Sequence, residues 1–234
     1  YLQKLIYNAL LSLLKYVVKN TTLQYIMPMG NLNIRLLQEV NRNIEVALKE
    51  DEVFRDLTTT ACLSKTKQGK ATLIIKEDAI LAGLPFIPLI SKSVDPLVDV
   101  TFLQEEGCQV PSNTPVATLK GPLRSLLSME RTALNFLQHT TSIATHTAKY
   151  VDEAGGKCDI LDTRKTLPCH RFLQKYAVAV GGGKNHRFHL GDQILIKDNH
   201  LSSLSILEAL TLSRKKYPLK RIQIEVENLE MFGE

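Results

Sequence analysis

The chain has 234 residues, 44% of them hydrophobic, and is therefore long enough to bury one large core or two small ones. Its 29 basic and 24 acidic residues give a formal net charge of +5 on a mixed surface, without the long Lys/Arg blocks of a nucleic-acid-binding tail. The four cysteines include no C-x-x-C pair, and a chain of this size needs no disulfides for stability, which favours a globular protein of the reducing cytoplasm.

The first 18 residues form an apolar run that raises the question of a targeting or membrane segment. Four polar residues interrupt the run, and no small-residue cleavage site follows it. We therefore predict an amphipathic helix here and no membrane association. Because the chain starts with Tyr1 and offers methionines at positions 27 and 29, residues 1–28 are predicted to be an extension.

Residues 29–140 carry the mixed signals of an α+β sandwich domain. Apolar residues at helical spacing predict a helix over 34–49, and residues 59–69 are expected to form a loop. Strand patterns follow at 70–77, 98–103 and 113–123. A long helix is then predicted from Ser125 to the Gly155–Gly156 pair, which ends it.

The pattern changes in the C-terminal part, residues 141–234. Short apolar strands at 158–162, 193–197 and 222–226 alternate with helical stretches at 171–180 and 201–215. This alternation is typical of parallel β/α units, whose sheet is buried on both faces. The predicted fold class is thus α/β with an α+β N-terminal domain: an N-terminal α/β sandwich domain followed by an incomplete parallel β/α barrel.

Charged and polar residues stand at the C-terminal end of each of these three strands, where parallel β/α folds place their ligand sites. They are Asp162, Arg164 and Lys165 after the first, Lys197, Asp198 and Asn199 after the second, and Glu225 and Glu227 after the third. Residues 164–200 hold seven Lys or Arg against two Asp, which equals the net charge of the whole chain, and also four of its six histidines. We therefore predict a site for an anionic ligand.

The glycine run 181–183 and the nearby histidines leave other interpretations open. The run fits neither the Walker nor the G-x-G-x-x-G spacing, so we expect a flexible turn that lets the backbone pass close to a neighbour, or an amide cradle for a phosphate. His186, His189 and His200 could hold zinc. The surrounding cations and the lack of an obvious orienting carboxylate in the loop disfavour that site.

The remaining reactive or charged side chains of this region receive simpler interpretations. Cys169 and His170 are neighbours in sequence, which does not by itself provide the geometry of a nucleophilic pair. Lys175 and Lys184 are expected to be surface residues. A mixed set of Arg and Lys elsewhere suits a small ligand with both carboxylates and phosphates, because arginine binds carboxylates bidentately and lysine supplies compact charge.

Four segments, MERTALNFLQ, DTRKTLPCHRFLQKYAVAVGGGKNHR, LIKDNH and IEVEN, resemble in order and spacing the quinolinate phosphoribosyltransferases, or carboxylating nicotinate-nucleotide pyrophosphorylases. EDEVFRDLTT and EDAILAGL are similar to this family too, so the resemblance covers roughly residues 31–229. It implies the reaction of quinolinate with phosphoribosyl pyrophosphate and Mg²⁺ to nicotinate mononucleotide, pyrophosphate and CO₂ in de novo NAD biosynthesis. The implied order is pyrophosphate departure, attack by the pyridine nitrogen, then decarboxylation.

The family's pattern also implies roles for seven residues of this chain. Arg164, His186 and Arg187 would hold the quinolinate carboxylates, and Lys165 and Lys197 carboxylate or pyrophosphate oxygens. Glu225 would face the ribose hydroxyls or Mg²⁺. Arg131 would reach the site of a neighbouring subunit, which implies a homodimer with shared active sites. The resemblance thus implies Lys165, Lys197 and Glu225 as catalytic residues, and Arg131, Arg164, His186 and Arg187 as further substrate-binding residues.

The chain departs from the family's pattern at several points. Arg55, Cys169 and His189 stand where the family usually has glycine, and the family continues through further barrel strands beyond residue 234. We expect an incomplete or frameshifted copy of an enzyme, with a degraded pseudoenzyme or completion by a second polypeptide as alternatives. Two other functions stay open: a related phosphoribosyltransferase for another heteroaromatic acid, and an inactive anion-binding or dimerisation module.

Overall fold

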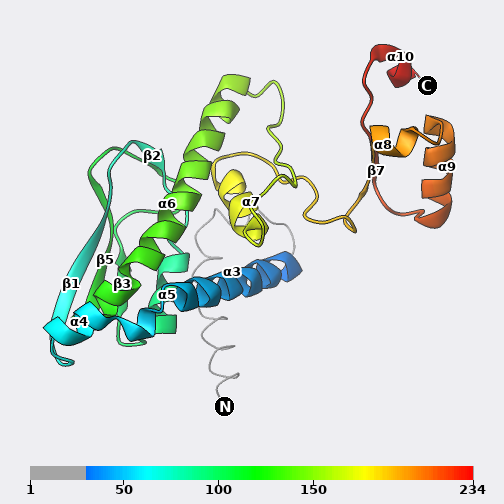
Figure 1. Ribbon diagram of the computed structural model, residues 1–234. Helices are drawn as coiled ribbons and strands as arrows, with labels where there is room; N and C mark the ends of the chain where they lie inside the picture. Colours follow the sequence, from blue (N-terminus) through cyan, green and yellow to red (C-terminus); the bar gives the residue numbers. More distant parts are fainter. Residues whose placement is uncertain (1–29, 234) are drawn as a thin grey trace. The chain divides into compact units, whose positions relative to one another are not determined.

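A computed structural model describes residues 30–233 of the chain, so the helix and the extension predicted for residues 1–28 lie outside the described residues (Figure 1). The chain divides into two compact units, which meet in sequence between Asn185 and His186. The helices of the first unit are α3 (Gly30–Glu50), η1 (Val53–Arg55), α4 (Leu57–Cys62), α5 (Phe86–Val94), α6 (Leu123–Ala154) and α7 (Arg171–Val180). Its strands are β1 (Gln68–Ile75), β2 (Ala79–Ile80), β3 (Asp99–Phe102), β4 (Gln109–Val110) and β5 (Thr114–Pro122).

The main sheet of the first unit is antiparallel, with strand order β1-β5-β3. Its register pairs Gln68 with Pro122 and Asp99 with Lys120, and β1 shifts register by a bulge between Leu73 and Ile74. The strands predicted over 70–77, 98–103 and 113–123 are therefore confirmed. β2 and β4 form a separate two-stranded antiparallel sheet.

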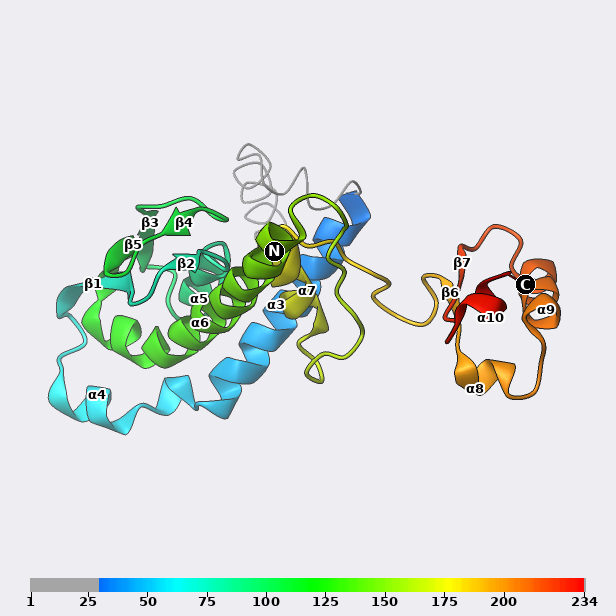
Figure 2. The same cartoon turned by 90° about the horizontal axis from the view of Figure 1, so that it is seen from above.

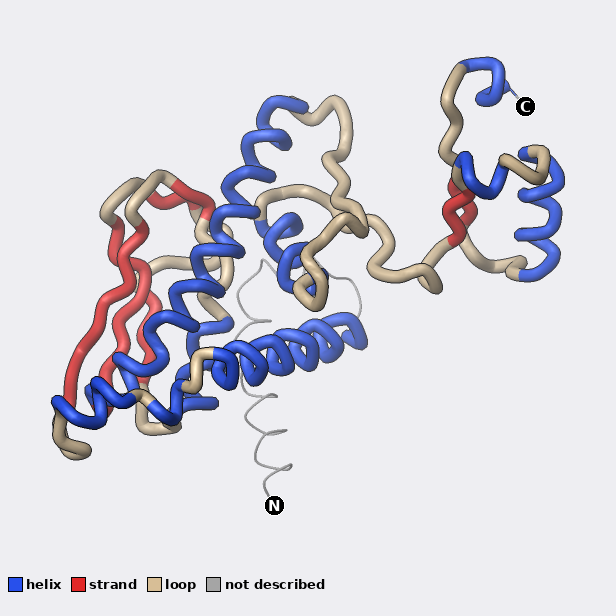
Figure 3. The backbone as a smooth tube through the Cα atoms, viewed as in Figure 1, coloured by secondary structure: helices blue, strands red, loops and turns tan. Residues whose placement is uncertain are grey.

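Helix α6 packs along β1 and β5 and is the centre of the first unit (Figure 2). Met129, Ala133 and Leu137 are buried on one face because they recur at four-residue spacing. The helix ends at Gly155, whose left-handed φ of 56° suits glycine, so the predicted stop at the glycine pair is confirmed. Residues 155–170 then lead to α7 without a helix or a strand (Figure 3).

Helix α3 covers the predicted range 34–49 and packs against α5 and α7. Leu36, Val40, Ile44 and Leu48 lie one turn apart and are all at most 4% exposed. A single apolar stripe thus binds the helix to its neighbours, as an amphipathic helix requires.

The loop predicted over 59–69 is wrong in its first part, because residues 57–62 form α4. Asp56 begins this helix by accepting a hydrogen bond from the backbone N–H of Thr59 at 2.8 Å. The N-cap bond supplies a partner for an amide that the first turn would otherwise leave free.

The second unit is a short parallel β/α segment. It contains β6 (Ile194–Ile196), α8 (Asp198–Leu201), α9 (Ile206–Lys216), β7 (Ile222–Ile224) and α10 (Leu229–Gly233). β6 and β7 are parallel neighbours with Ile196 opposite Ile224, which confirms the strands predicted at 193–197 and 222–226. Ser205 and Glu208 cap the start of α9, so the helix predicted over 201–215 is divided into α8 and α9.

Two predictions about the parallel sheet are wrong. Residues 158–162 do not form a strand. Their pairing is limited to an isolated parallel bridge between Leu161 and Lys184. The sheet of the second unit is also not buried on both faces, since Ile196 is the one buried residue among the residues of β6 and β7.

Candidate active site

Lys197 and Glu225 form an ion pair at the carboxyl ends of the two parallel strands. Each follows directly on a strand, and because Ile196 and Ile224 are register partners, the next residues lie side by side. The Lys197 Nζ is 2.7 Å from Glu225 Oε2, with side-chain exposures of 41% and 62%. The expected convergence of charged groups at these strand ends is thus present for this pair, which offers both a cation and a carboxylate to a ligand.

Two glutamines, which sequence reasoning missed, connect His186 and Arg187 to the same strands. His186 Nε2 lies 2.7 Å from Gln223 Oε1 in β7 and 2.7 Å from Gln193 Nε2. Arg187 Nη1 donates to the carbonyl oxygen of Gln193 at 3.2 Å. Each glutamine stands next to the apolar residues of a strand in the sequence, a position that could have marked it as a side chain lining the strand.

The three histidines considered for zinc each have a different partner. His189 Nε2 lies 2.7 Å from Asp192 Oδ1, so the loop does contain an orienting carboxylate, contrary to the sequence analysis. His200 Nδ1 accepts a hydrogen bond from the backbone N–H of Lys197 at 3.1 Å. Among the described residues no group of three His, Cys, Asp or Glu could hold a metal ion. The zinc interpretation therefore has no geometric support in this part of the chain.

Arg164 and Lys165 belong to the first unit. They follow closely on Leu161, which forms a parallel bridge with Lys184. The Lys165 side chain is exposed, and its backbone N–H donates to Thr163 Oγ1 at 3.0 Å. Arg164 Nε is buried and has no hydrogen-bond partner among the residues that the structure describes. A buried donor in that state is costly unless another acceptor reaches it.

Arg131 lies on α6, exposed, at a groove with a volume of about 480 Å³. The groove is lined by α6 and by residues 73–79, and besides Arg131 its ionisable side chains are Lys76, Glu77, Asp78, His146 and Lys149. The Arg131 side chain is therefore accessible from outside its own unit. None of the other predicted site residues lines this groove.

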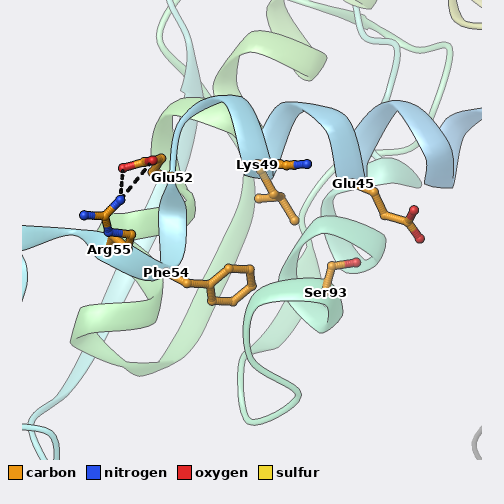
Figure 4. A pocket seen from close by; sticks show the side chains of 7 residues that line it. Glu45, Lys49, Glu52, Phe54, Arg55 and Ser93 are labelled. Carbon is orange, nitrogen blue, oxygen red and sulfur yellow. Dashed lines mark hydrogen bonds and ion pairs between the residues drawn. The ribbon is translucent and has the colours of Figure 1, made fainter.

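A second cavity, of about 430 Å³, lies where α3, η1 and α5 meet, and none of the predicted site residues lines it (Figure 4). In it, Arg55 Nη1 lies 3.2 Å from both carboxylate oxygens of Glu52, an ion pair that is largely exposed (Figure 4). Arg55 stands at a position where the resembled family usually has glycine. Among the described non-glycine residues, positive φ occurs at Glu52, Asn113 and Cys169 but not at Arg55, so the replacement at Arg55 needs no strained backbone.

Cys169 differs, because it adopts a left-handed φ of 64° at another of these usual glycine positions. A side chain in this conformation is strained by about 1–2 kcal/mol relative to the right-handed region. The carbonyl oxygen of Cys169 accepts a hydrogen bond from Asn43 Nδ2 of α3 at 3.1 Å. The loop thus keeps a backbone form suited to glycine although the glycine is absent.

The expected surface position of Lys175 is wrong, whereas Lys184 is exposed as predicted. Lys175 has no exposed side-chain area and forms an ion pair with Asp162, which is 7% exposed. Lys184 is 64% exposed and pairs with Asp159 at 2.7 Å. Burial of a lysine requires a paired charge, and Asp162 provides it for Lys175 of α7.

The glycine run packs against α6 and α7. A Cβ at Gly181 would clash with the carbonyl oxygen of Ala144, and one at Gly183 would lie 2.7 Å from Val178 Cγ1. This contact supports the interpretation of the run as a turn that passes close to a neighbour, since a side chain at either position would push α6 and α7 apart.

Comparison with known proteins identifies the family of the chain. The profile of the quinolinate phosphoribosyl transferase N-terminal domain matches residues 56–141, and that of the C-terminal domain matches residues 143–234. The chain belongs to the quinolinate phosphoribosyltransferase family. The expected resemblance is thereby confirmed.

Among its relatives, the nicotinate-nucleotide pyrophosphorylase [carboxylating] of Mycobacterium leprae is 40% identical over 192 residues, 80% of this chain and 68% of that protein. The chain is also 40% identical to a probable nicotinate-nucleotide pyrophosphorylase [carboxylating] of Synechocystis, over 77% of its own length and 62% of the relative's. It thus spans about two thirds of the length of these two family members.

Solved structures confirm the predicted fold class. NadC from Streptococcus pyogenes superposes with a TM-score of 0.79 and 38% identity, over 82% of this chain and 69% of that one. The nicotinate-nucleotide pyrophosphorylase of Francisella tularensis gives a TM-score of 0.80, also at 38% identity, over 84% and 70% of the two chains. Within the described residues of this family member, no helix is both long and apolar enough to cross a membrane.

Proposed function

We propose that the chain carries the quinolinate phosphoribosyltransferase site and transfers phosphoribosyl from phosphoribosyl pyrophosphate to quinolinate, with loss of CO₂, in de novo NAD biosynthesis. The main support is the Lys197–Glu225 pair, with 2.7 Å between Nζ and Oε2, at the ends of two parallel strands in a member of this family. Such strand ends are where β/α folds bind their substrates.

The proposed substrates explain the concentration of cations. Quinolinate has two carboxylates, and the second substrate has a phosphate and a diphosphate. The two anionic substrates repel each other unless cations lie between them. Arg164, His186 and Arg187 are proposed to bind the carboxylates. A carboxylate oxygen would also supply the acceptor that the buried Arg164 Nε lacks within the described residues.

Lys165 and Lys197 are proposed to stabilise the negative charge that develops on the departing diphosphate. Fixed cations aimed at developing charge lower the barrier because they need no reorganisation during the reaction. Glu225 would accept hydrogen bonds from ribose hydroxyls and, through its ion pair, keep Lys197 in place. The positive charge on the pyridinium nitrogen, formed by attack of the ring nitrogen, stabilises the ring carbanion that remains when the C–C bond breaks and CO₂ leaves. A proton from water would then form the C–H bond at that carbon.

Mg²⁺ would enter as a complex with phosphoribosyl pyrophosphate. Within residues 30–233 no carboxylate cluster can hold a metal ion by itself, and Glu225 is one exposed carboxylate beside a lysine. That donor set fits Mg²⁺ whose other ligands are diphosphate oxygens and water, a common arrangement for this ion. When bound, the ion would neutralise charge on the diphosphate leaving group.

We further propose a homodimer, a cytoplasmic location, and the domain limits 29–140 and 141–234. The exposed position of Arg131 on α6 supports the dimer, because an exposed side chain is accessible to a second subunit. The four cysteines are free thiols in the structure, which suits a reducing compartment.

The decisive experiment measures nicotinate mononucleotide formation by the purified chain from quinolinate, phosphoribosyl pyrophosphate and Mg²⁺. Lys197→Ala should lower kcat/KM by at least about 100-fold, since a cation is lost from the developing diphosphate charge. Lys215→Ala, on the exposed surface of α9, is the matched control and should leave the rate unchanged. Equal rates for both variants would contradict the proposed site.

A well-folded chain without turnover would favour the anion-binding module, and turnover with a different acid would favour a related phosphoribosyltransferase. Circular dichroism of each variant separates loss of fold from loss of chemistry. Calorimetric titration with quinolinate then separates binding from turnover.

A further inference from the structure

One face of α7 holds the segment that carries Arg164 and Lys165. Arg171, Gln174 and Lys175 occupy positions i, i+3 and i+4 and therefore point to the same side of the helix. Arg171 Nε donates to Thr166 Oγ1 at 3.1 Å, and Gln174 Oε1 accepts from the backbone N–H of Leu167 at 3.1 Å. The third residue, Lys175, donates to Asp162 Oδ1.

The Lys175–Asp162 pair is the buried end of this face. The two side chains are 0% and 7% exposed. Asn185 Nδ2 donates to the second carboxylate oxygen, Asp162 Oδ2, at 2.7 Å, and to the carbonyl oxygen of Lys175 at 2.8 Å. Both oxygens of the buried carboxylate thus have a donor, the condition under which a buried ion pair keeps one geometry.

Lys175, Asp162 and Asn185 thus form a node, and two of its members stand at the start of two cation-bearing segments. Asp162 is two residues before Arg164, and Asn185 directly precedes His186 and Arg187. The backbone joins the same two segments, because Lys184 N donates to Ile160 O at 2.8 Å and Asp162 N donates to Lys184 O at 3.1 Å. A change at the node would therefore move the anchor points of both segments.

We propose that Lys175, Asp162 and Asn185 form a positioning node that orders the Arg164–Lys165 segment for ligand binding. The three residues act through the backbone of residues 162–167. The assignment of quinolinate as the ligand rests on the proposed function, but the ordering of the segment does not. Ordering in advance matters because a displacement of about 1 Å in a binding group can cost about 100-fold in rate.

A neighbouring ion pair provides the matched control. Lys184 and Asp159 connect the same two segments, with 2.7 Å between Nζ and Oδ2, but their side chains are 64% and 58% exposed. Exposed pairs contribute little to stability because water solvates both charges well. Lys184→Met should therefore leave the 162–167 segment as ordered as it is in the unchanged chain.

The test compares Asn185→Ala with Lys184→Met by amide hydrogen exchange of residues 162–167. Asn185→Ala removes two hydrogen bonds and leaves the ion pair, so exchange at Asp162, Lys165 and Leu167 should become at least about tenfold faster, whereas the control should not change it. Unchanged exchange in Asn185→Ala would overturn the node. If that variant does not fold, the double variant Lys175→Met/Asp162→Asn replaces it, because removing both charges avoids an unpaired buried ion.

The second measurement is calorimetric quinolinate affinity at a temperature at which circular dichroism shows every variant folded. Asn185→Ala should weaken binding about tenfold, and the control should not. Faster exchange with unchanged affinity would overturn the positioning role. If the unchanged chain binds no quinolinate, the proposed function fails, while the hydrogen exchange result still decides whether the node orders the segment.

Discussion

At the scale of single residues, Glu106 couples the stability of the fold to pH. Its carboxylate accepts hydrogen bonds from the backbone N–H groups of Gly83 (2.6 Å) and Leu84 (3.0 Å) and from Tyr176 Oη (2.6 Å). Burial raises the pKa of Glu106 from its usual 4.5 to about 7, although the three donors act in the opposite direction. The group therefore binds its proton more tightly in the folded chain.

The free energy of unfolding should consequently fall as the pH rises from 4.5 to 7. Both states are protonated below this window, and in it the unfolded state loses its proton first, which favours unfolding. The loss is on the order of 3 kcal/mol, since each pKa unit corresponds to about 1.4 kcal/mol. Urea denaturation across this range measures it.

Glu106→Gln should remove this pH dependence, because the amide does not titrate. Glu105→Gln is the control, since Glu105 is the exposed neighbour in the chain, and it should keep the slope of the unchanged protein. A slope retained in Glu106→Gln would contradict the assignment to Glu106.

At the scale of elements, α4 depends on its N-cap. Asp56 accepts from Thr59 N and, at 2.8 Å, from Ser128 Oγ of α6, so it both starts the helix and fastens it to α6. The hydrogen bonds from Thr59 and then from Ser128 lower the pKa of Asp56. Asp56→Ala should reduce the free energy of unfolding by about 1–2 kcal/mol, measured by urea denaturation. Asp51→Ala, at an exposed turn residue, should change it by less than about 0.5 kcal/mol.

The sequence predicts those elements whose signal is long and regular. The stripe from Leu36 to Leu48 and the glycine stop at Gly155 mark α3 and α6, and both helices lie where expected. The short helix α4 escapes prediction because its residues include three threonines, which are poor helix formers, and because its start depends on the cap at Asp56. Local pattern therefore predicts long elements and misses those that a tertiary contact stabilises.

The site is predictable to a similar extent. Strand periodicity alone places Lys197 and Glu225 at neighbouring strand ends, where the structure has them 2.7 Å apart. It cannot show that Lys175 is buried, because its partner Asp162 is 13 residues away along the chain and the pair forms only in the folded state. Nor does it predict the contacts of Gln193 and Gln223 with His186, since neutral amides carry no charge signal.

At the scale of the whole molecule, the two compact units differ in the apolar surface they bury. The core of the first unit includes Val116, Met129 and Ile87, each at most 1% exposed, whereas in the described part of the second unit the buried hydrophobic residues are Ile196 and Ala209. A two-stranded sheet with so small a core is only marginally stable. Backbone amides of β6, β7 and α9 should therefore open far more often than those of β5 and α6.

Hydrogen exchange followed by mass spectrometry measures this difference directly. We expect peptides from 114–154 to be protected at least about 100-fold more strongly than peptides from 194–224, because opening of the second unit breaks few apolar contacts. Equal protection in both units would show that the chain unfolds as one cooperative body. Adding quinolinate then provides a second comparison, since the proposed binding of this ligand by His186, Arg187 and Lys197 should slow exchange in the second unit by mass action.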